Sequence, residues 1–269
     1  MTYAEVIGDP IAHSLSPAIH RHWIARANLD ADYRATRVTP DELPAVLAAR
    51  REDPDWVGCN VTIPHKLAIL DLVDDAQAVR DSVGAANTAV RRPDGSLFAT
   101  NTDAAGFWAP IADLDLAGLP VAVVGGGGAA RAVLWALAQV GVGPVTVLNR
   151  NVLKASALLA RLGLAGRALP LDARLPPAAL LVNASALGMT GQPPLALDLS
   201  PLPEDAVVYD LVYAPVETDL LAAAHARGLE TVGGLEMLLA QAALAFELLF
   251  GVAPDREDDE ALVRRLTGG

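Results

Sequence analysis

The sequence contains a single cysteine, Cys59, which excludes an internal disulfide framework and any metal site built from several cysteines. No apolar stretch reaches the roughly 18 to 20 uninterrupted residues that a membrane-spanning helix needs. The N-terminus lacks a charged region followed by an apolar run, so we expect a cytoplasmic protein with no membrane partner. The five histidines do not join carboxylates at a coherent ligand spacing, and we expect no metal.

Positive charge is also scarce. The chain has 20 Lys and Arg residues against 32 Asp and Glu residues, which gives a formal net charge of −12 at pH 7. Because non-specific phosphate binding depends on Lys and Arg, this balance argues against a nucleic-acid partner, and an anionic ligand must meet a local basic cluster. Only Lys66 and Lys154 are lysine. A perturbed lysine can exchange a proton whereas arginine stays protonated, so each lysine is a candidate for a chemical role.

Short apolar runs alternate with helical patterns along the chain, which is typical of an α/β fold with a mostly parallel sheet. A chain of 269 residues with 52% hydrophobic composition is long enough for two domains, and we expect two. The first part predicts strands or helices at residues 4–8, 17–28, 33–38, 40–50 and 56–62. A second series of alternating strands and helices begins at Leu119. Its strands are predicted at residues 121–124, 145–148, 180–183 and 207–211, and its helices at residues 129–140 and 235–250.

A glycine cluster follows the strand predicted at residues 121–124. In Gly125-x-Gly127-x-x-Ala130, the first glycine permits a tight turn and the second lets the backbone approach a pyrophosphate, while the third position needs a small residue. Unpaired N–H groups at the start of the following helix bind phosphates. Glycine-rich turns also serve geometry alone, but the strand before and the helix after this cluster favour a dinucleotide site.

The end of the next strand distinguishes NAD from NADP. An NAD enzyme places Asp or Glu there to accept from the ribose 2′-OH, whereas this chain has Asn149-Arg150. No acidic residue occurs from Leu116 to Leu171. Arg150 can offer a planar fork to a 2′-phosphate, with Lys154 one turn along as a point charge, so we expect NADP. The alternative for Arg161 and Arg167, and also for Lys154, is a solvated helix face.

Three segments combine polar side chains with chain breakers: residues 13–17, 60–66 and 101–103. Each follows a predicted strand, and ligands of open α/β sheets bind at the carboxyl ends of the strands. Their hydroxyls, amides, amine and carboxylate match a polyhydroxylated small molecule. Each has a structural alternative. Ser16 could be a helix N-cap, Asn87-Thr88 a turn, Asp103 a helix cap and Lys66 an ordinary exposed lysine.

Taken together, these segments resemble the shikimate dehydrogenase family over nearly the whole chain, in order and in spacing. The motifs that carry the resemblance are Ser14-Leu15-Ser16-Pro17, Asn60-Val61-Thr62-Ile63-Pro64-His65-Lys66, Gly84-Ala85-Ala86-Asn87-Thr88, Asn101-Thr102-Asp103, the glycine cluster with Arg131, Asn149-Arg150, Asn183-Ala184-Ser185-Ala186-Leu187-Gly188-Met189, Asp210-Leu211-Val212-Tyr213 and Gly234-x-x-Met237-x-x-x-Gln241. Asn151 departs from the threonine that is usual after Asn-Arg.

The resemblance implies a two-domain enzyme: a substrate-binding domain at residues 1–103, an NADP-binding Rossmann domain at residues 104–234 and a C-terminal helical segment, 235–269, returning to the substrate domain. It implies Lys66 and Asp103 as the catalytic pair. The implied substrate-binding residues are Ser14, Ser16, Thr62, Asn87, Tyr213 and Gln241. The implied cofactor-binding residues are Gly125, Gly126, Gly127, Gly128, Ala129, Asn149, Arg150, Lys154, Leu211, Gly234 and Met237.

The activity that the resemblance implies is the reversible reduction of 3-dehydroshikimate to shikimate with NADPH, in the biosynthesis of aromatic amino acids. One alternative is a quinate/shikimate dehydrogenase that uses NAD. Another is a non-catalytic sensor of a pathway metabolite, which should lack the Lys66 and Asp103 pair or carry an additional DNA-binding module. We expect a small-molecule substrate as the partner, with a homodimer as the candidate assembly.

Overall fold

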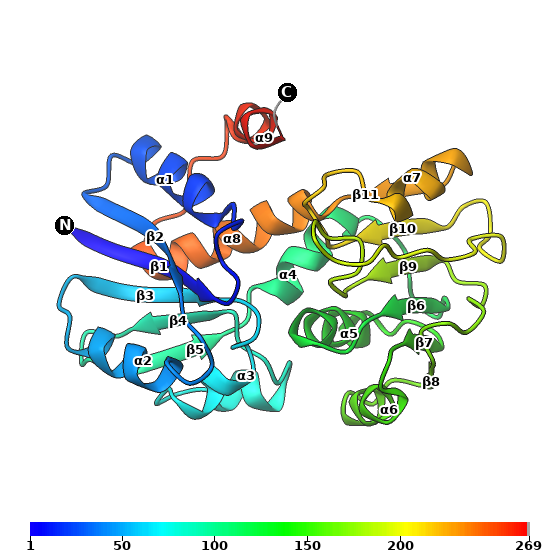
Figure 1. Ribbon diagram of the computed structural model, residues 1–269, viewed down its shortest axis with the longest axis horizontal. Helices are drawn as coiled ribbons and strands as arrows, with labels where there is room; N and C mark the ends of the chain where they lie inside the picture. The colour runs from blue at the N-terminus through cyan, green and yellow to red at the C-terminus, as the bar shows by residue number, and fades with distance from the viewer. Residues whose placement is uncertain (268–269) are drawn as a thin grey trace. The chain divides into compact units, whose positions relative to one another are not determined.

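The computed structural model describes residues 1–267, which form two compact units (Figure 1). Unit 1 comprises Met1–Thr102 and the chain from Leu239 onward, and unit 2 comprises Asp103–Leu238. Each unit contains one β-sheet, so the α/β class expected from the sequence is confirmed. Within the described residues, no helix is both long and apolar enough to cross a bilayer.

The sheet of unit 1 combines parallel strands with a hairpin, in the order β2-β1-β3-β4-β5. Its strands are β1 (Thr2–Gly8), β2 (Ala31–Arg37), β3 (Trp56–Val61), β4 (Thr88–Arg91) and β5 (Leu97–Thr100). The first three are parallel, while β4 runs antiparallel to both β3 and β5. The carboxyl ends of β1, β3 and β5 therefore share one edge of the sheet with the amino end of β4. We call this the polar edge of unit 1.

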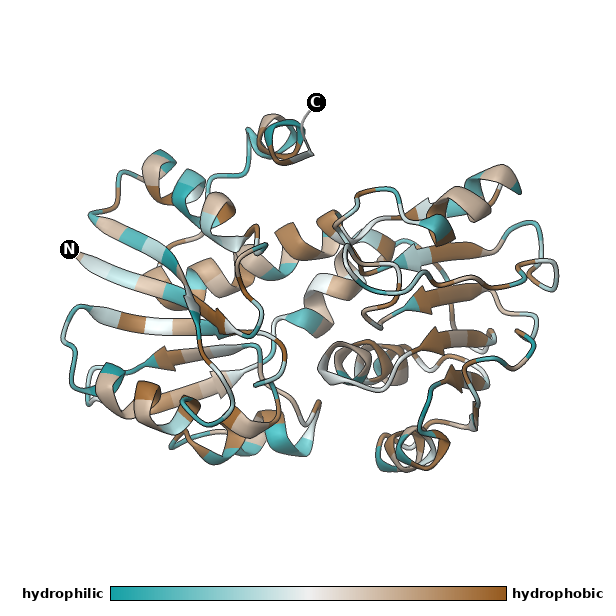
Figure 2. Cartoon of the chain, in the orientation of Figure 1, coloured by the Kyte–Doolittle hydropathy of each residue, from teal (hydrophilic) through white to brown (hydrophobic). Residues whose placement is uncertain are grey.

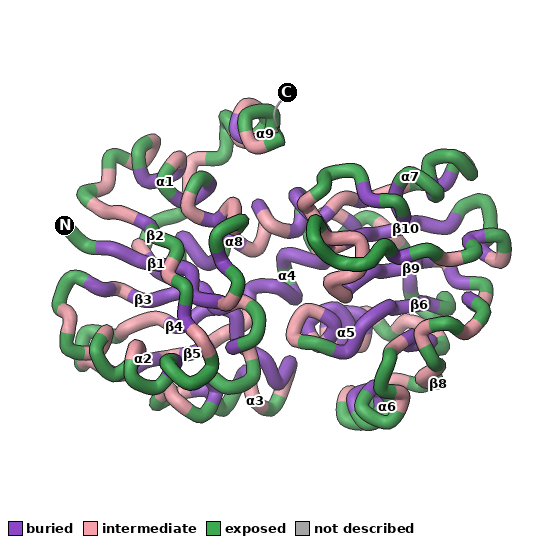
Figure 3. The backbone as a smooth tube through the Cα atoms, viewed as in Figure 1, coloured by how far each residue is buried: buried purple, intermediate pink, exposed green. Residues whose placement is uncertain are grey.

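The core of unit 1 joins helices from both ends of the chain. Its helices are α1 (Ser16–Arg26), α2 (Leu43–Arg51), the 3-10 turn η1 (Ala68–Asp71), α3 (Gln77–Asp81), α8 (Gly234–Phe250, from Leu239 onward) and α9 (Asp259–Thr267). Trp23 of α1 meets Phe246 of α8 edge to face, with ring centroids 5.8 Å apart. Both rings are fully buried, and in Figure 3 the buried residues of α1 and α8 are purple among pink and green ones. The later part of α8 thereby completes the core of unit 1.

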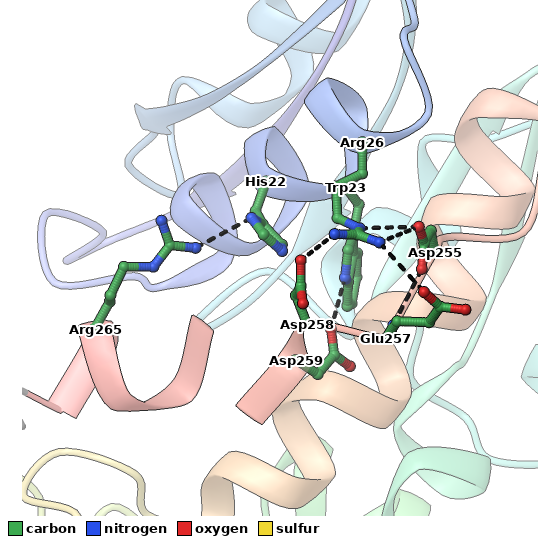
Figure 4. A network of polar contacts seen from close by, with 8 residues as sticks. All are labelled: His22, Trp23, Arg26, Asp255, Glu257, Asp258, Asp259 and Arg265. Atoms are coloured by element: carbon green, nitrogen blue, oxygen red, sulfur yellow. Dashed lines mark hydrogen bonds and ion pairs between the residues drawn. The ribbon is translucent and has the colours of Figure 1, made fainter. Parts of the chain in front are cut away.

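Helix α9 and the turn before it are attached to α1 (Figure 4). Arg26 forms ion pairs with Asp255 and Asp258, which are largely exposed and therefore contribute little stability. The buried indole of Trp23 donates from Nε1 to Asp259 Oδ1 at 2.9 Å. A buried donor without an acceptor is costly, so this bond is the most consequential of the group. It fixes the first residue of α9 on α1.

The sheet of unit 2 is wholly parallel, in the order β11-β10-β9-β6-β7-β8. Its strands are β6 (Val121–Val124), β7 (Val145–Leu148), β8 (Gly166–Leu169), β9 (Leu180–Asn183), β10 (Val207–Asp210) and β11 (Glu230–Val232). β6, β7 and β9 are buried along their whole length and strongly apolar (Figure 2). Strands covered on both faces show such continuous apolar runs rather than alternation.

The strand order of unit 2 reverses between β6 and β9. From β6 the chain proceeds to β7 and β8 on one side, and β9, β10 and β11 follow on the other. Helices α4 (Asp103–Trp108), α5 (Gly128–Val140), α6 (Val152–Arg161) and α7 (Asp219–Ala226), the 3-10 turn η2 (Ala109–Ile111) and the start of α8 accompany this sheet. Ligands of open α/β sheets bind at the carboxyl ends of the strands where such a reversal occurs.

Candidate functional site

The polar edge of unit 1 gathers several of the expected substrate-binding residues. Asn60 of β3 is paired in register with Thr88 of β4, which in turn is paired with Thr100 of β5. Asn87 precedes β4 and Thr102 follows β5, so the hairpin brings them to the same edge. The turn alternative for Asn87-Thr88 is wrong, because Thr88 begins a strand and Asn87 is buried beside it.

Asn87 is held in one orientation by bonds on both sides of its carboxamide. Its Oδ1 accepts from the Thr102 amide at 2.8 Å and from the Thr88 hydroxyl at 3.1 Å. Its Nδ2 donates to Thr102 Oγ1 at 2.8 Å and to Gln241 Oε1 at 3.2 Å. Gln241 comes from the part of α8 that belongs to unit 1. Two expected substrate-binding residues are thus in direct contact.

Ser14 and Ser16 lie in the loop after β1 and at the start of α1. Leu15 is the N-cap of this helix, and no side chain caps it, so the N-cap alternative for Ser16 is wrong. Instead Ser14 Oγ accepts from the Ser16 amide at 3.3 Å, a local turn that keeps both hydroxyls at the helix start. Ser14 is half-buried and Ser16 is 8% exposed. Both remain available as candidates to bind a carboxylate.

Thr62 and Lys66 belong to the turn that follows β3. The Thr62 amide donates to Ile7 O at 3.0 Å, and Thr62 O accepts from the His65 amide at 2.9 Å. His65 is fully buried and shares a hydrogen bond between Nε2 and Val38 O at 2.7 Å. Lys66 is half-buried, and its carbonyl accepts from the Ala86 amide at 2.7 Å. The backbone on both sides of Lys66 is therefore held by hydrogen bonds.

Asp103 is the first residue of α4 and is 4% exposed. It belongs to unit 2 by its contacts, whereas Lys66 belongs to unit 1. Just before it, Asn101 donates from Nδ2 to Ala85 O at 2.8 Å, which anchors the chain as it leaves β5. A carboxylate this deeply buried has to be compensated by polar contacts, so its placement is a candidate for a chemical role.

The glycine cluster lies at the strand reversal of unit 2, between β6 and α5. A Cβ on Gly125, whose φ is +119°, would lie 2.7 Å from Ala184 O, and one on Gly126 would lie 2.8 Å from Asn149 Nδ2. At Gly127 a Cβ would meet no described atom within 4 Å. Two glycines therefore serve close packing inside the turn, while the third leaves its outer face open to a ligand. Gly128 and Ala129 begin α5, whose first N–H groups can bind phosphate.

Cationic side chains follow β7 beside this turn. Arg150 and Lys154 are exposed, and Asn149 donates from Nδ2 to Asn151 O at 2.9 Å. Asn151 is the N-cap of α6, where its side chain accepts from the Lys154 amide at 2.9 Å. The departure from threonine at this position thus preserves a capping residue. Arg131 of α5 has Nε and Nη1 buried with no hydrogen-bond partner in the described chain, and burial lowers its pKa.

A buried network orders the loops after β9 and β10. Asn183 Nδ2 donates to Asp210 Oδ1 at 2.8 Å, and the Thr218 hydroxyl donates to Asp210 Oδ2 at 2.7 Å. Asp210 is fully buried, and desolvation raises its pKa despite these bonds. The Val212 amide also donates to Asp210 Oδ1, which ties the carboxylate to the backbone that continues into Tyr213. The network fixes the segment that carries two expected ligand contacts, Leu211 and Tyr213.

The remaining expected cofactor residues lie where α8 begins. A Cβ on Gly234 would come within 2.4 Å of Leu211 O, so glycine is required for this close approach. Met237 is 7% exposed. Burial raises the pKa of Tyr213, which keeps its hydroxyl protonated as a hydrogen-bond donor. Leu211, Gly234 and Tyr213 therefore belong to one locally ordered part of unit 2.

Several contributors to the polar edge of unit 1 were missed as individual site residues, among them Tyr33, Asn60, Thr88 and Thr102. Tyr33 of β2 is fully buried and donates from its hydroxyl to Asn60 Oδ1 at 2.6 Å. The sequence gives no signal that pairs residues 27 positions apart on strands that are not neighbours. Asn60 is a polar residue at the end of an apolar strand. For this reason the sequence predicted residues 60–66 as a polar segment, but it indicated no role for Asn60 itself.

Comparison with known proteins places these features in a family. The model of the shikimate dehydrogenase substrate binding domain matches residues 6–89, and that of the shikimate 5'-dehydrogenase C-terminal domain matches residues 234–264. The chain is 63% identical over 260 residues to a shikimate dehydrogenase (NADP(+)) of Sphingopyxis alaskensis, an alignment that covers 97% of this chain and 95% of the relative.

Solved structures support the same family assignment. Shikimate 5-dehydrogenase from Thermus thermophilus, in complex with NADP(H) and shikimate, has a TM-score of 0.86 at 39% identity and covers 99% of this chain and 100% of that one. The ligand-free 5-ketofructose reductase of a Gluconobacter species has a TM-score of 0.85 at 29% identity, with coverage of 99% and 98%. The second similarity shows that this fold accommodates another substrate, so the sequence relatives decide the family. The chain belongs to the shikimate dehydrogenase family.

Proposed function

We propose that this chain reduces the C3 ketone of 3-dehydroshikimate to the alcohol of shikimate with NADPH, and catalyses the reverse reaction with NADP. The observation that carries the proposal is the presence of two complementary sites in one chain. The polar edge of unit 1 offers hydroxyls and amides that suit a polyhydroxylated acid. Unit 2 offers an open glycine turn and an acid-free cationic segment that suit a phosphorylated dinucleotide.

The residues of unit 2 fit NADP. Gly127 leaves room for the pyrophosphate at the start of α5, and the Nε and Nη1 atoms of Arg131 have no hydrogen-bond partner in the described chain. We assign the pyrophosphate to Gly125, Gly126, Gly127, Gly128 and Ala129, the adenosine end with its 2′-phosphate to Asn149, Arg150 and Lys154, and the nicotinamide end to Leu211, Gly234 and Met237. When bound, NADPH supplies the hydride.

Substrate binding and proton transfer are assigned to residues of unit 1 together with Asp103 and Tyr213 of unit 2. As hydride arrives, negative charge develops on the ketone oxygen, and a proton donor within hydrogen-bond reach lowers the barrier. We assign this donor to Lys66 Nζ, and we assign to Asp103 the acceptance of a hydrogen bond from a substrate hydroxyl. Ser14, Ser16, Thr62, Asn87, Tyr213 and Gln241 bind the carboxylate and the remaining hydroxyls.

Location and assembly are further parts of the proposal. The buried free thiol of Cys59 fits a reducing compartment, and we propose the cytoplasm. We also propose a homodimer, which light scattering of the purified protein tests directly.

An absorbance assay at 340 nm tests the proposed activity. The purified chain is supplied with shikimate or quinate, each combined with NADP or NAD, and the organic product is identified by mass. Shikimate with NADP should give the largest kcat/KM. A larger value for quinate with NAD would support the alternative dehydrogenase, and no turnover with any combination, together with retained shikimate binding, would support the sensor.

A further inference from the structure

A buried chain of hydrogen bonds leads from Tyr33 to the polar edge of unit 1. The Tyr33 hydroxyl donates to Asn60 Oδ1 at 2.6 Å, and Asn60 Nδ2 donates to Thr88 Oγ1 at 3.0 Å. Asn60 Nδ2 also approaches the carbonyl oxygen of Asn87 at 3.3 Å. Tyr33 and Thr88 are 0% exposed and Asn60 is 7% exposed, so solvent cannot substitute for a lost partner.

The chain continues through Asn87 in the same donor-to-acceptor direction. The Thr88 hydroxyl donates to Asn87 Oδ1 at 3.1 Å, and Asn87 Nδ2 donates to Thr102 Oγ1 at 2.8 Å. The Thr102 hydroxyl then donates to Gln241 Oε1 at 3.4 Å. Each hydroxyl inside the chain accepts from one neighbour and donates to the next. Such chains polarise their members and are sensitive to the loss of one donor.

Tyr33 stands at the far end of this chain. Burial raises the pKa of its hydroxyl well above the ordinary value, so the hydroxyl stays protonated and able to donate to Asn60. If the Asn60 carboxamide flipped, its Nδ2 would lose both acceptors and its Oδ1 would face Thr88 Oγ1 and the Asn87 carbonyl. The Asn87 carbonyl, which can only accept, therefore sets the Asn60 orientation, and the Tyr33 hydroxyl holds Asn60 in that orientation by donating to its Oδ1.

Tyr33 itself cannot reach a ligand. Its ring is stacked on His20, with centroids 4.0 Å apart and planes 9° from parallel, and its hydroxyl points to Asn60. We propose that Tyr33 is a positioning residue for substrate recognition, acting through Asn60 and Thr88 on the Asn87 carboxamide. This inference rests on the proposed function, in which Asn87 binds the substrate.

The Tyr33→Phe variant tests the inference because it removes one oxygen and keeps the ring on His20. The KM for shikimate should rise about threefold to tenfold, the effect of one net hydrogen bond, while kcat changes less than twofold. The KM for NADP should stay unchanged, since unit 2 holds the expected cofactor residues. Two outcomes would overturn the inference. One is a fall in kcat by a larger factor than the rise in the KM for shikimate, and the other is an equal rise in the KM for shikimate and the KM for NADP.

Tyr209→Phe is the matched control. The Tyr209 hydroxyl is buried in β10 of unit 2 without a hydrogen-bond partner in the described chain, and its ring is stacked on Phe107 at 5.2 Å. Removing this hydroxyl should leave the KM for shikimate unchanged. An equal rise in both tyrosine variants would show a general effect of deleting a buried hydroxyl and would contradict the inference.

A double-mutant cycle shows whether Tyr33 acts through Asn87. In an Asn87→Ala background, Tyr33→Phe should have no further effect on the KM for shikimate. If the two substitutions raise the KM for shikimate by independent factors that multiply in the double variant, the inference is overturned. If Tyr33→Phe does not fold, Thr88→Val interrupts the same chain and Thr88→Ser restores its hydroxyl; the inference requires that Val raises the KM for shikimate and Ser rescues it.

The unmodified chain, assayed alongside, separates the two ideas. Absence of NADP-linked shikimate oxidation in the unmodified chain contradicts the proposed function. If the unmodified chain is active and the folded Tyr33→Phe variant has an unchanged KM for shikimate, the positioning role of Tyr33 is contradicted while the proposed function stands.

Discussion

The two units build their polar sites in different ways. At the polar edge of unit 1, neutral side chains bond to one another, and Asn87 uses both ends of its carboxamide on protein partners. In unit 2 the expected phosphate site consists of backbone N–H groups and cations, with no acidic residue from Leu116 to Leu171. Unit 1 therefore depends on fixed hydrogen-bond directions, and unit 2 depends on charge.

This difference has consequences for specificity. A site with fixed polar groups discriminates against ligands whose hydroxyls do not match the directions of those groups. A site built on exposed cations gains affinity from the charge of the ligand, and this contribution weakens as salt screens it. We therefore expect unit 1 to choose the organic substrate and unit 2 to choose between NADP and NAD.

The largest effect should come from Lys66→Arg, which keeps the positive charge but removes a group able to release a proton near neutral pH. Substrate binding should persist, while kcat falls about 10²-fold to 10⁴-fold, the usual contribution of a general acid or base. Steady-state kinetics with shikimate and NADP measure both quantities. Retention of most activity with unaltered binding would show that charge alone suffices.

Asp103→Asn extends this test. The variant should also lower kcat, and the double variant with Lys66→Arg should be little worse than the worse single variant if the two residues act as a unit. Fully multiplicative losses would contradict a joint role.

Arg150→Ala should have the next largest effect, confined to the cofactor. Losing a charge-assisted contact to the 2′-phosphate should cost about 1.5 to 3 kcal/mol, more than tenfold in kcat/KM for NADP. Turnover with NAD should be nearly unchanged. Equal use of NADP and NAD by the unmodified enzyme would contradict the assignment of Arg150.

The units should also respond differently to acid. Burial lowers the pKa of His20 in unit 1 to about 3, whereas it raises the pKa of Asp210 in unit 2. Below pH 6.5 the unfolded chain protonates at residue 20 while the folded chain does not, so the free energy of unfolding falls as pH drops toward 3. Asp210 acts in the opposite direction, because above pH 3.8 the unfolded carboxyl releases its proton first.

His20→Leu should remove the acid-dependent term of unit 1. Between pH 6.5 and pH 5 that term amounts to about 1.5 kcal/mol of the free energy of unfolding. Urea denaturation at several pH values measures it. If the free energy of unfolding changes with pH as steeply in the variant as in the unmodified chain, His20 does not cause the pH dependence.

The smallest effect should come from Ser14→Ala. Its hydroxyl accepts from the Ser16 amide, so stability should fall by at most about 1 kcal/mol, while the KM for shikimate rises about threefold to tenfold. Ser14→Thr keeps the hydroxyl and serves as the control. A large drop in Tm with an unchanged KM would favour a purely structural role for Ser14.

The sequence predicted the boundaries of the buried strands of unit 2 most sharply, although the bounds of β8, β11, α6 and α7 of that unit were not predicted. The boundaries of β6, β7 and β9 agree with the expected strands, because buried parallel strands are uniformly apolar and end at glycine or polar residues. In unit 1 a strand was expected just before Asn101, but its bounds and its hairpin with β4 were not predicted, although Pro93-Asp94-Gly95 is a typical turn sequence and Gly95 has a φ of +84°. Short half-buried strands give too little periodicity to identify.

The polar groups show the same limit. A local pattern identified the glycine cluster, since its turn and helix are adjacent in the chain. The contact between Asn87 and Gln241 joins residues 154 positions apart, and only the family resemblance suggested that both bind substrate. The Tyr33 contact had no local signal, because the packing of β2, β1 and β3 sets it.

In this account unit 1 chooses the organic substrate and unit 2 chooses the cofactor. The most direct test of this division measures kcat/KM for shikimate with NADP and with NAD, in the unmodified chain and in the Asn87→Ala and Arg150→Ala variants. The account predicts that Asn87→Ala lowers kcat/KM by the same factor with either cofactor, leaving the NADP-to-NAD ratio unchanged. It predicts that Arg150→Ala reduces that ratio more than tenfold with the KM for shikimate unaltered. A change in the cofactor ratio in Asn87→Ala, or a raised KM for shikimate in Arg150→Ala, would contradict it.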